Sequence, residues 1–185
     1  MFYILKGLLQ GKFWRNLDIV PNSEGSRRSI VKKQFPKIAY ILCDIILLIT
    51  TDEIGSDYSV YDRCLEFAQR ANIQLLDTDR PSIIIIHNKF AVSLENVQNE
   101  LDVDISSQLF LDTFDKENEL AKFFSSCKVV RLPLLSQAHD SALLRSLWDQ
   151  QIEKLLDIIN NLSHDRYESR KEFGYQLTET AWFKV

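Results

Sequence analysis

The chain has 185 residues, of which 45% are apolar and 26% are charged, and its formal net charge is -4. This length suits one domain with a substantial core and leaves little room for a second. The weakly acidic balance excludes a general attraction for nucleic acid or for anionic membranes.

Apolar spacing and turn residues divide the chain into alternating strands and helices. In chain order the predicted elements are a helix at 2–9, a loop at 14–29, a helix at 30–40, a strand at 44–50, a helix at 58–71, a strand at 82–87, one or two helices within 94–124, a strand at 127–132 and a helix at 141–162. Apolar strands that alternate with helices are typical of a parallel sheet covered on both faces. The sequence therefore predicts a three-layer α/β fold with a mostly parallel sheet. Residues 1–162 would form the domain and 163–185 a helical or extended tail.

The segment from Pro81 to Phe90 is the most informative part of the sequence. Its four consecutive isoleucines predict a strand that is buried on both faces, and Asn88 and Lys89 follow at the carboxyl end. Ligands of open parallel sheets bind outside the carboxyl ends of the strands. The Asn88 amide offers an acceptor and two donors, and the Lys89 stem can lie flat over a heterocycle. These two residues are therefore candidates for binding a nucleotide base, and a polar strand exit without a ligand is the alternative.

Asn88 and Lys89 match the start of N-K-x-D, the base-reading motif of GTP-binding proteins, although Ala91 stands where the motif has Asp. Around this pair, residues 30–162 resemble the latter two-thirds of a P-loop GTPase domain, closest to the large dynamin-like or guanylate-binding type. The matching segments are 35–47 (the helix after switch II and the next strand), 82–90 (the base-reading strand), 129–133 with Ser136, Gln137 and Ala138 (the last strand and the final base-contacting loop), and 141–162 (the closing helix). The resemblance implies that Ser136, Gln137 and Ala138 cover the base.

The phosphate-binding loop of this family, G-x-x-x-x-G-K-[ST], has only a poor counterpart in the chain. Gly7 and Gly11 are one residue too close, Phe13 replaces the hydroxyl that holds Mg²⁺, and no strand is predicted before them. Residues 2–13 look instead like the helix that follows a phosphate loop. On this interpretation the domain is truncated at its N-terminal side, and the chain begins after the phosphate-binding residues.

A second family element, the switch II motif D-x-x-G, has a degraded counterpart at Asn22, Glu24 and Gly25. Asn22 carries no charge and would hold Mg²⁺ poorly. The same residues also fit a switch I loop, in which case D-x-x-G is missing, or a turn rich in Pro, Asn and Gly.

The three cysteines, Cys43, Cys64 and Cys127, are widely spaced and indicate buried free thiols in a reducing compartment, which favours the cytoplasm. The histidines share no metal-ligand spacing, and no catalytic constellation is predicted. A signal peptide and a transmembrane segment are not expected, because no basic leader precedes the apolar start and the longest apolar stretch is broken by Asp44.

The resemblance implies a divergent or incomplete guanine-nucleotide-binding domain that does not hydrolyse GTP as an isolated chain. GTP or GDP would bind weakly, and Mg²⁺ is not expected to be held. The alternative is a non-catalytic α/β protein-interaction module, a pseudo-GTPase, whose partner is a protein or a second copy of this chain. In a third interpretation, sequence upstream of Met1 supplies the phosphate loop.

Overall fold

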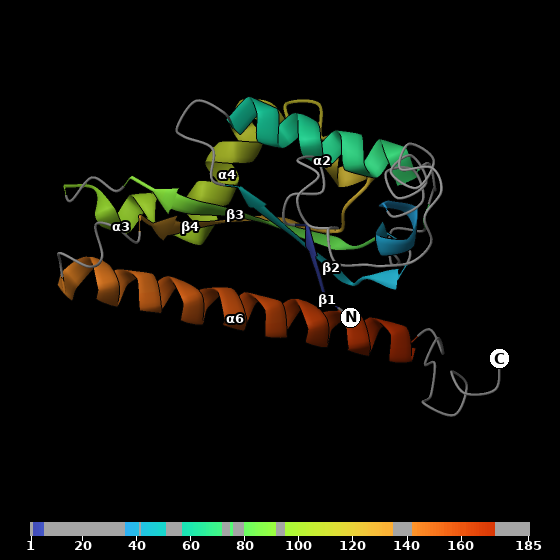
Figure 1. Cartoon of the computed structure of the whole chain (residues 1–185). Coiled ribbons are helices and arrows are strands. Elements are labelled where there is room, and N and C mark those ends of the chain that lie inside the picture. Colours follow the sequence, from blue (N-terminus) through green and yellow to red (C-terminus); the bar gives the residue numbers. More distant parts are fainter. Residues whose placement is uncertain are drawn as a thin grey trace, which may run out of the picture.

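The structure, a computed structural model, describes residues 2–5, 36–40, 42–50, 57–71, 75, 80–91, 95–134 and 142–172. Within these ranges four strands form one sheet, and helices cover both of its faces (Figure 1). This arrangement confirms the three-layer α/β fold.

The strands lie side by side in the order in which they occur in the chain. Strand β2 (Ile45–Thr50) pairs with β1 (Phe2–Leu5) on one side and with β3 (Ser82–Phe90) on the other, and β3 pairs with β4 (Cys127–Pro133). All three pairings are parallel. The strands predicted at 44–50, 82–87 and 127–132 are therefore confirmed, although β3 continues to Phe90.

The helix predicted at 2–9 is wrong in its first part, because Phe2–Leu5 forms strand β1. The register pairs Phe2 with Ile45 and Leu5 with Leu48. A short apolar run does not reveal its own period, so pairing along β2 decides its structure. A strand therefore does precede Gly7, contrary to the prediction, whereas residues 6–35 lie outside the described ranges.

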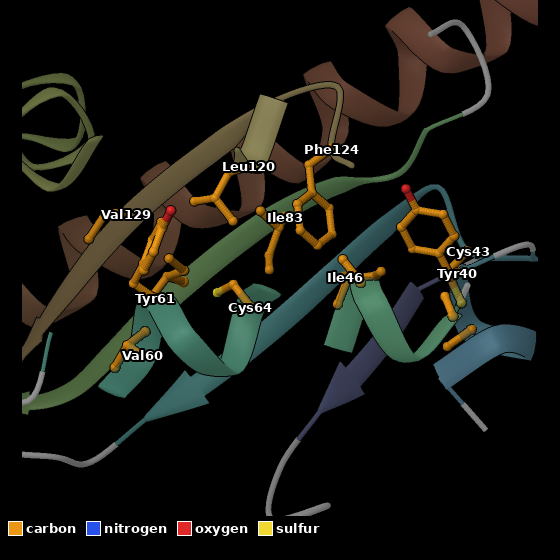
Figure 2. Packing of buried hydrophobic residues seen from close by; sticks show 14 of the residues in the cluster. Tyr40, Cys43, Ile46, Val60, Tyr61, Cys64, Ile83, Leu120, Phe124 and Val129 are labelled. Carbon is orange, nitrogen blue, oxygen red and sulfur yellow. The ribbon is translucent and has the colours of Figure 1, made fainter. Parts of the chain in front are cut away.

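Within the described residues, the helices of the β2–β3 and β3–β4 connections pack on one face of the sheet, as do the helical residues 36–40, and the C-terminal helix packs on the other face. Helix α2 (Asp57–Ala71) joins β2 to β3, and α4 (Val103–Phe114) lies between β3 and β4. Because both connections advance in the same direction, right-handed crossovers place both helices on the same face. Ile83 packs into the core with these helices (Figure 2). Ile85 belongs to the same core, whereas Ile84 and Ile86 pack into a second core beneath α6 (Ala142–Glu172). The prediction of a strand buried on both faces is thus confirmed.

The helical region predicted within 94–124 consists of three short pieces. These are α3 (Val97–Glu100), α4 and the 3-10 helix η2 (Leu120–Lys122). Asp102 caps α4, since its carboxylate accepts the Ile105 N–H at 2.9 Å. The chain turns again at Asp115, whose backbone N–H donates to the Leu111 carbonyl at the end of α4.

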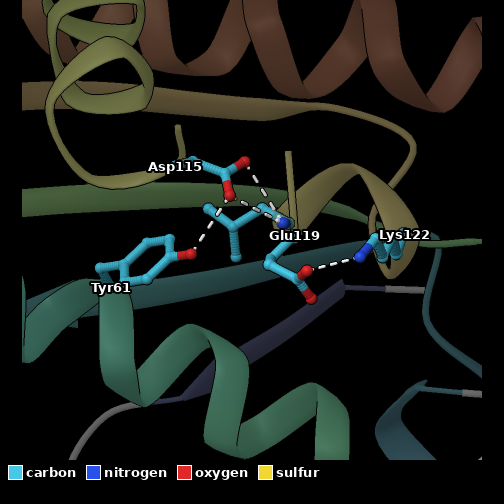
Figure 3. A network of polar contacts seen from close by, with 5 residues as sticks. Tyr61, Asp115, Glu119 and Lys122 are labelled. Atoms are coloured by element: carbon cyan, nitrogen blue, oxygen red, sulfur yellow. Dashed lines mark hydrogen bonds and ion pairs between the residues drawn. The ribbon is translucent and has the colours of Figure 1, made fainter. Parts of the chain in front are cut away.

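Asp115 is a buried carboxylate that ties three elements together (Figure 3). Its oxygens accept the Leu120 N–H of η2 at 3.2 Å, and one of them accepts the Tyr61 hydroxyl of α2 at 3.2 Å. Burial, followed by the neighbouring Asp115 charge, raises the pKa of Tyr61 to about 12, so the phenol remains a donor at neutral pH. The turn in between places Asn118 at φ 54°, a left-handed conformation that Asn adopts more readily than most residues.

The outer side of β4 is covered by the segment that contains α3 and α4. Ser107 of α4 accepts the Val129 N–H at 2.9 Å, and the Arg131 guanidinium donates to the Glu100 carbonyl at 3.3 Å. Lys128 donates to Asp104 at 2.8 Å, and this contact lowers the pKa of the Asp104 carboxyl. The Ser107 contact occupies a backbone N–H that a bare edge strand would offer to another chain.

Helix α6 continues past the end predicted at 162 and runs to Glu172. Trp148 packs against the core beneath α6. Further along α6, the Arg166 side chain is 7% exposed. Its Nε lies 3.8 Å from Oδ1 of Asp44, the residue before β2. The added length of the helix therefore contacts the sheet domain.

The three cysteines are free, and we expect them to react slowly with thiol reagents in the native state. Burial raises the pKa of Cys43 and of Cys64, and it raises the pKa of Cys127 to about 12. Because the thiolate is the reactive species, at pH 8 Cys127 should react about a thousandfold more slowly than a thiol of ordinary pKa. Titration with Ellman's reagent checks this: all three thiols should react rapidly in guanidinium chloride, and a rapid native-state phase from Cys127 would contradict its burial.

Candidate functional site

The candidate site lies at the carboxyl edge of the sheet, where β2 ends at Thr50 and β4 at Pro133. Strand β3 continues three residues past His87, the partner of Thr50, and ends at Phe90 opposite Pro133. Asn88 and Lys89 lie in this last part of the strand. Asn88 is half-buried and pairs in register with Leu132. Leu132 belongs to the core beneath α6, so the alternation of the strand directs the Asn88 side chain to the same layer.

A row of polar residues crosses the sheet one position before Asn88. Thr50, His87 and Arg131 are consecutive neighbours in the register of β2, β3 and β4. Thr50 is 3% exposed and His87 is 7% exposed, so both side chains are packed in the interior. By strand alternation, these three residues lie on the face of the sheet that α2 and α4 cover. The Arg131 guanidinium, at the β4 end of the row, donates to the Glu100 carbonyl.

A β-bulge interrupts β3 at the candidate residues. Asn88 pairs with Leu132, but Phe90 pairs with the very next residue, Pro133, so Lys89 is the extra residue. A bulge bends the strand and redirects the side chains that follow it, and bulges are over-represented next to active sites. This bulge could not be predicted from residue type, because residues 88–90 include no glycine.

Ala91 follows β3 directly and is exposed. Its methyl group can neither donate nor accept a hydrogen bond, so the carboxylate that would read guanine is absent from this position. At the end of β3, the half-buried amide of Asn88 carries the donor and acceptor groups that could pair with a base.

The other predicted site residues lie outside the described residues. This applies to Ser136, Gln137 and Ala138 after β4, and to Asn22, Glu24 and Gly25. It applies also to the degenerate glycine–lysine segment, Gly7 to Phe13, which follows β1 in the sequence. The short glycine spacing and Phe13 still distinguish this segment from a phosphate loop. The absence of a preceding strand does not, because β1 lies directly before Gly7.

No group of three or more His, Cys, Asp or Glu side chains in the described part of the chain is arranged to hold a metal ion. No helix in that part is both long and apolar enough to cross a membrane. Comparison of the whole chain with protein-family models, curated proteins and solved structures found no match.

Proposed function

We propose that the chain is a divergent GTPase-like domain of the P-loop NTPase type, which binds a guanine nucleotide weakly and does not hydrolyse GTP by itself. The observation that carries the proposal is the position of Asn88, half-buried at the carboxyl end of a strand that is covered on both faces. An amide there can pair with the polar edge of a purine. The bulge at Lys89 adds support, since such irregularities are frequent beside binding sites.

The affinity should be low because the groups that bind phosphate and Mg²⁺ in such domains are degenerate in this sequence. Gly7 to Phe13 has the wrong spacing, and Asn22 replaces a carboxylate that would orient the metal. We expect a nucleotide whose base alone is bound, by a few hydrogen bonds, to have a Kd of about 1 mM, which is a binding free energy of roughly −4 kcal/mol.

Isothermal titration with GTP and Mg²⁺ tests the proposal. We expect weak binding to the native chain, no binding to Asn88→Ala or Lys89→Ala, and no GTP turnover above the spontaneous rate. Asn160→Ala and Lys154→Ala are matched controls, because both residues are exposed on α6, and they should bind like the native chain. Micromolar affinity would mean that the phosphate contacts exist and would overturn the incomplete-site proposal.

The second candidate is a non-catalytic interaction module, and the exposed methyl group of Ala91 in place of a base-reading carboxylate favours it. In this case GTP does not bind the native chain or Lys89→Ala, while a protein or a second copy of the chain still binds. For either function we propose a reducing compartment such as the cytoplasm, which the three free thiols support.

A further inference from the structure

Two polar side chains of α6 lie within the core beneath this helix. Gln151 is 1% exposed and stands one turn from Trp148 and one turn from Leu155, which both pack in this core. Oε1 of Gln151 and the indole Nε1 of Trp148 are buried, and neither has a hydrogen-bond partner among the described residues. A buried polar group without a partner destabilises the folded state, and proteins keep such groups mainly at functional sites.

The contact of Arg166 shows which part of the sheet Gln151 faces. Nε of Arg166 lies 3.8 Å from Oδ1 of Asp44, and the register of β2 and β3 makes Asp44 level with Pro81, seven residues before Asn88. Seven residues of a strand span roughly 23 Å, which corresponds to about 15 residues of a helix. Helix α6 begins after the carboxyl end of β4 and reaches Asp44 at the opposite edge of the sheet, so it runs antiparallel to the strands (Figure 1). Counting back from Arg166 therefore places Gln151 level with Asn88, on the face of the sheet to which Asn88 points.

Asn88, Trp148 and Gln151 together offer the groups that bind the edge of a purine. Such an edge presents an acceptor beside a donor, for example the O6 carbonyl beside the N1–H group of guanine. The Gln151 carbonyl can accept from the base, and the Trp148 N–H can donate to it. Asn88 and Trp148 are both half-buried, so they lie between the surface and the more deeply buried Gln151.

We propose that the base of the bound nucleotide enters between the end of β3 and α6, where Gln151 and Trp148 bind its edge together with Asn88. This inference rests on the proposed function, because it requires that a nucleotide binds beside Asn88. The base provides the donor for Gln151 Oε1 and the acceptor for Trp148 Nε1. Burial of these two polar groups thus lowers the stability of the free protein and serves binding.

The substitution Gln151→Leu separates binding from stability. Leucine suits the apolar surroundings and removes the buried oxygen, so the melting temperature of the free protein should stay the same or rise by roughly 2 to 5 °C. The dissociation constant for GTP should rise at least about tenfold, because a donor of the base then remains unpaired. Gln150→Leu is the matched control. Gln150 is the exposed neighbour on α6 and donates to Ser146 at 3.3 Å, and its replacement should leave GTP binding unchanged.

The test is a titration of the native chain, Gln151→Leu and Gln150→Leu with GTP, followed by proton–nitrogen correlation spectra, with melting temperatures measured in parallel. We expect the indole N–H signal of Trp148, identified by its loss in Trp148→Phe, to shift together with the Asn88 amide. Native-like affinity in Gln151→Leu, or a Trp148 signal that stays unchanged while the Asn88 amide shifts, would overturn the inference and leave the proposed function intact. A melting temperature of Gln151→Leu more than about 5 °C below the native value would also overturn the inference, since Gln151 would then stabilise the fold. The absence of GTP binding to the native chain would overturn the proposed function together with the inference.

Discussion

Replacing Asp115 with alanine should lower the free energy of unfolding by about 3 kcal/mol, because two buried donors lose their acceptor. The Asp115 side chain is 5% exposed and accepts hydrogen bonds from the Leu120 N–H and the Tyr61 hydroxyl. Tyr61 is 8% exposed and Leu120 is 1% exposed, so water replaces the lost acceptor poorly. Urea unfolding of the native chain and of the variant, monitored by circular dichroism, measures the difference.

Three further variants separate the effect of Asp115 from that of any acidic residue on α4. Asp112→Ala removes an exposed carboxylate that accepts from Gln108, and it should cost less than about 0.5 kcal/mol. Asp115→Asn keeps one acceptor oxygen and should cost less than Asp115→Ala, and Tyr61→Phe should cost about 1 kcal/mol. If Asp115→Ala and Asp112→Ala were equally mild, the buried network would not contribute to stability.

Truncation of either central isoleucine of β3 should be equally severe, although the two side chains point in opposite directions. Ile84 faces α6 and Ile85 faces α2 and α4, and each is 0% exposed. We expect Ile84→Ala and Ile85→Ala each to lower the free energy of unfolding by roughly 3 to 4 kcal/mol, through lost burial and a residual cavity. Denaturant unfolding of the two variants provides the comparison.

The control for these truncations is Leu109→Ala, because Leu109 is 55% exposed on α4 and should tolerate the change within about 0.5 kcal/mol. The comparison between Ile84 and Ile85 also tests the three-layer architecture. A mild Ile84→Ala beside a severe Ile85→Ala would mean that α6 does not cover its face of the sheet.

The elements that could be predicted are those whose apolar pattern is long and consistent. Strand β3 and helix α2 follow their patterns to within a few residues. Strand β1 was missed because Phe2–Leu5 is too short to show a period and depends on its partner β2. The extension of α6 to Glu172 was missed because its last turns are polar, although Arg166 packs near Asp44.

The candidate site was predictable only where local sequence determines it. The apolar run of isoleucines located Asn88 at a strand end, and the register then aligned it with Leu132. The bulge at Lys89 and the buried row that includes His87 depend on how β3 pairs with its neighbours, and no single stretch of sequence encodes that pairing. The Asp115 network likewise joins residues 54 positions apart, Tyr61 and Asp115.

Amide proton–nitrogen correlation spectra recorded during a titration with GTP test most directly whether β3 ends in a base-binding site. We predict that the shifts concentrate on the amides of Asn88 and Ala91 and on their neighbours Thr50 and Leu132 at the carboxyl edge of the sheet. The amides at the opposite edge, such as Ser82 and Cys127, should stay unchanged. Shifts confined to that opposite edge, or no shifts at any nucleotide concentration, would contradict a base site at the end of β3.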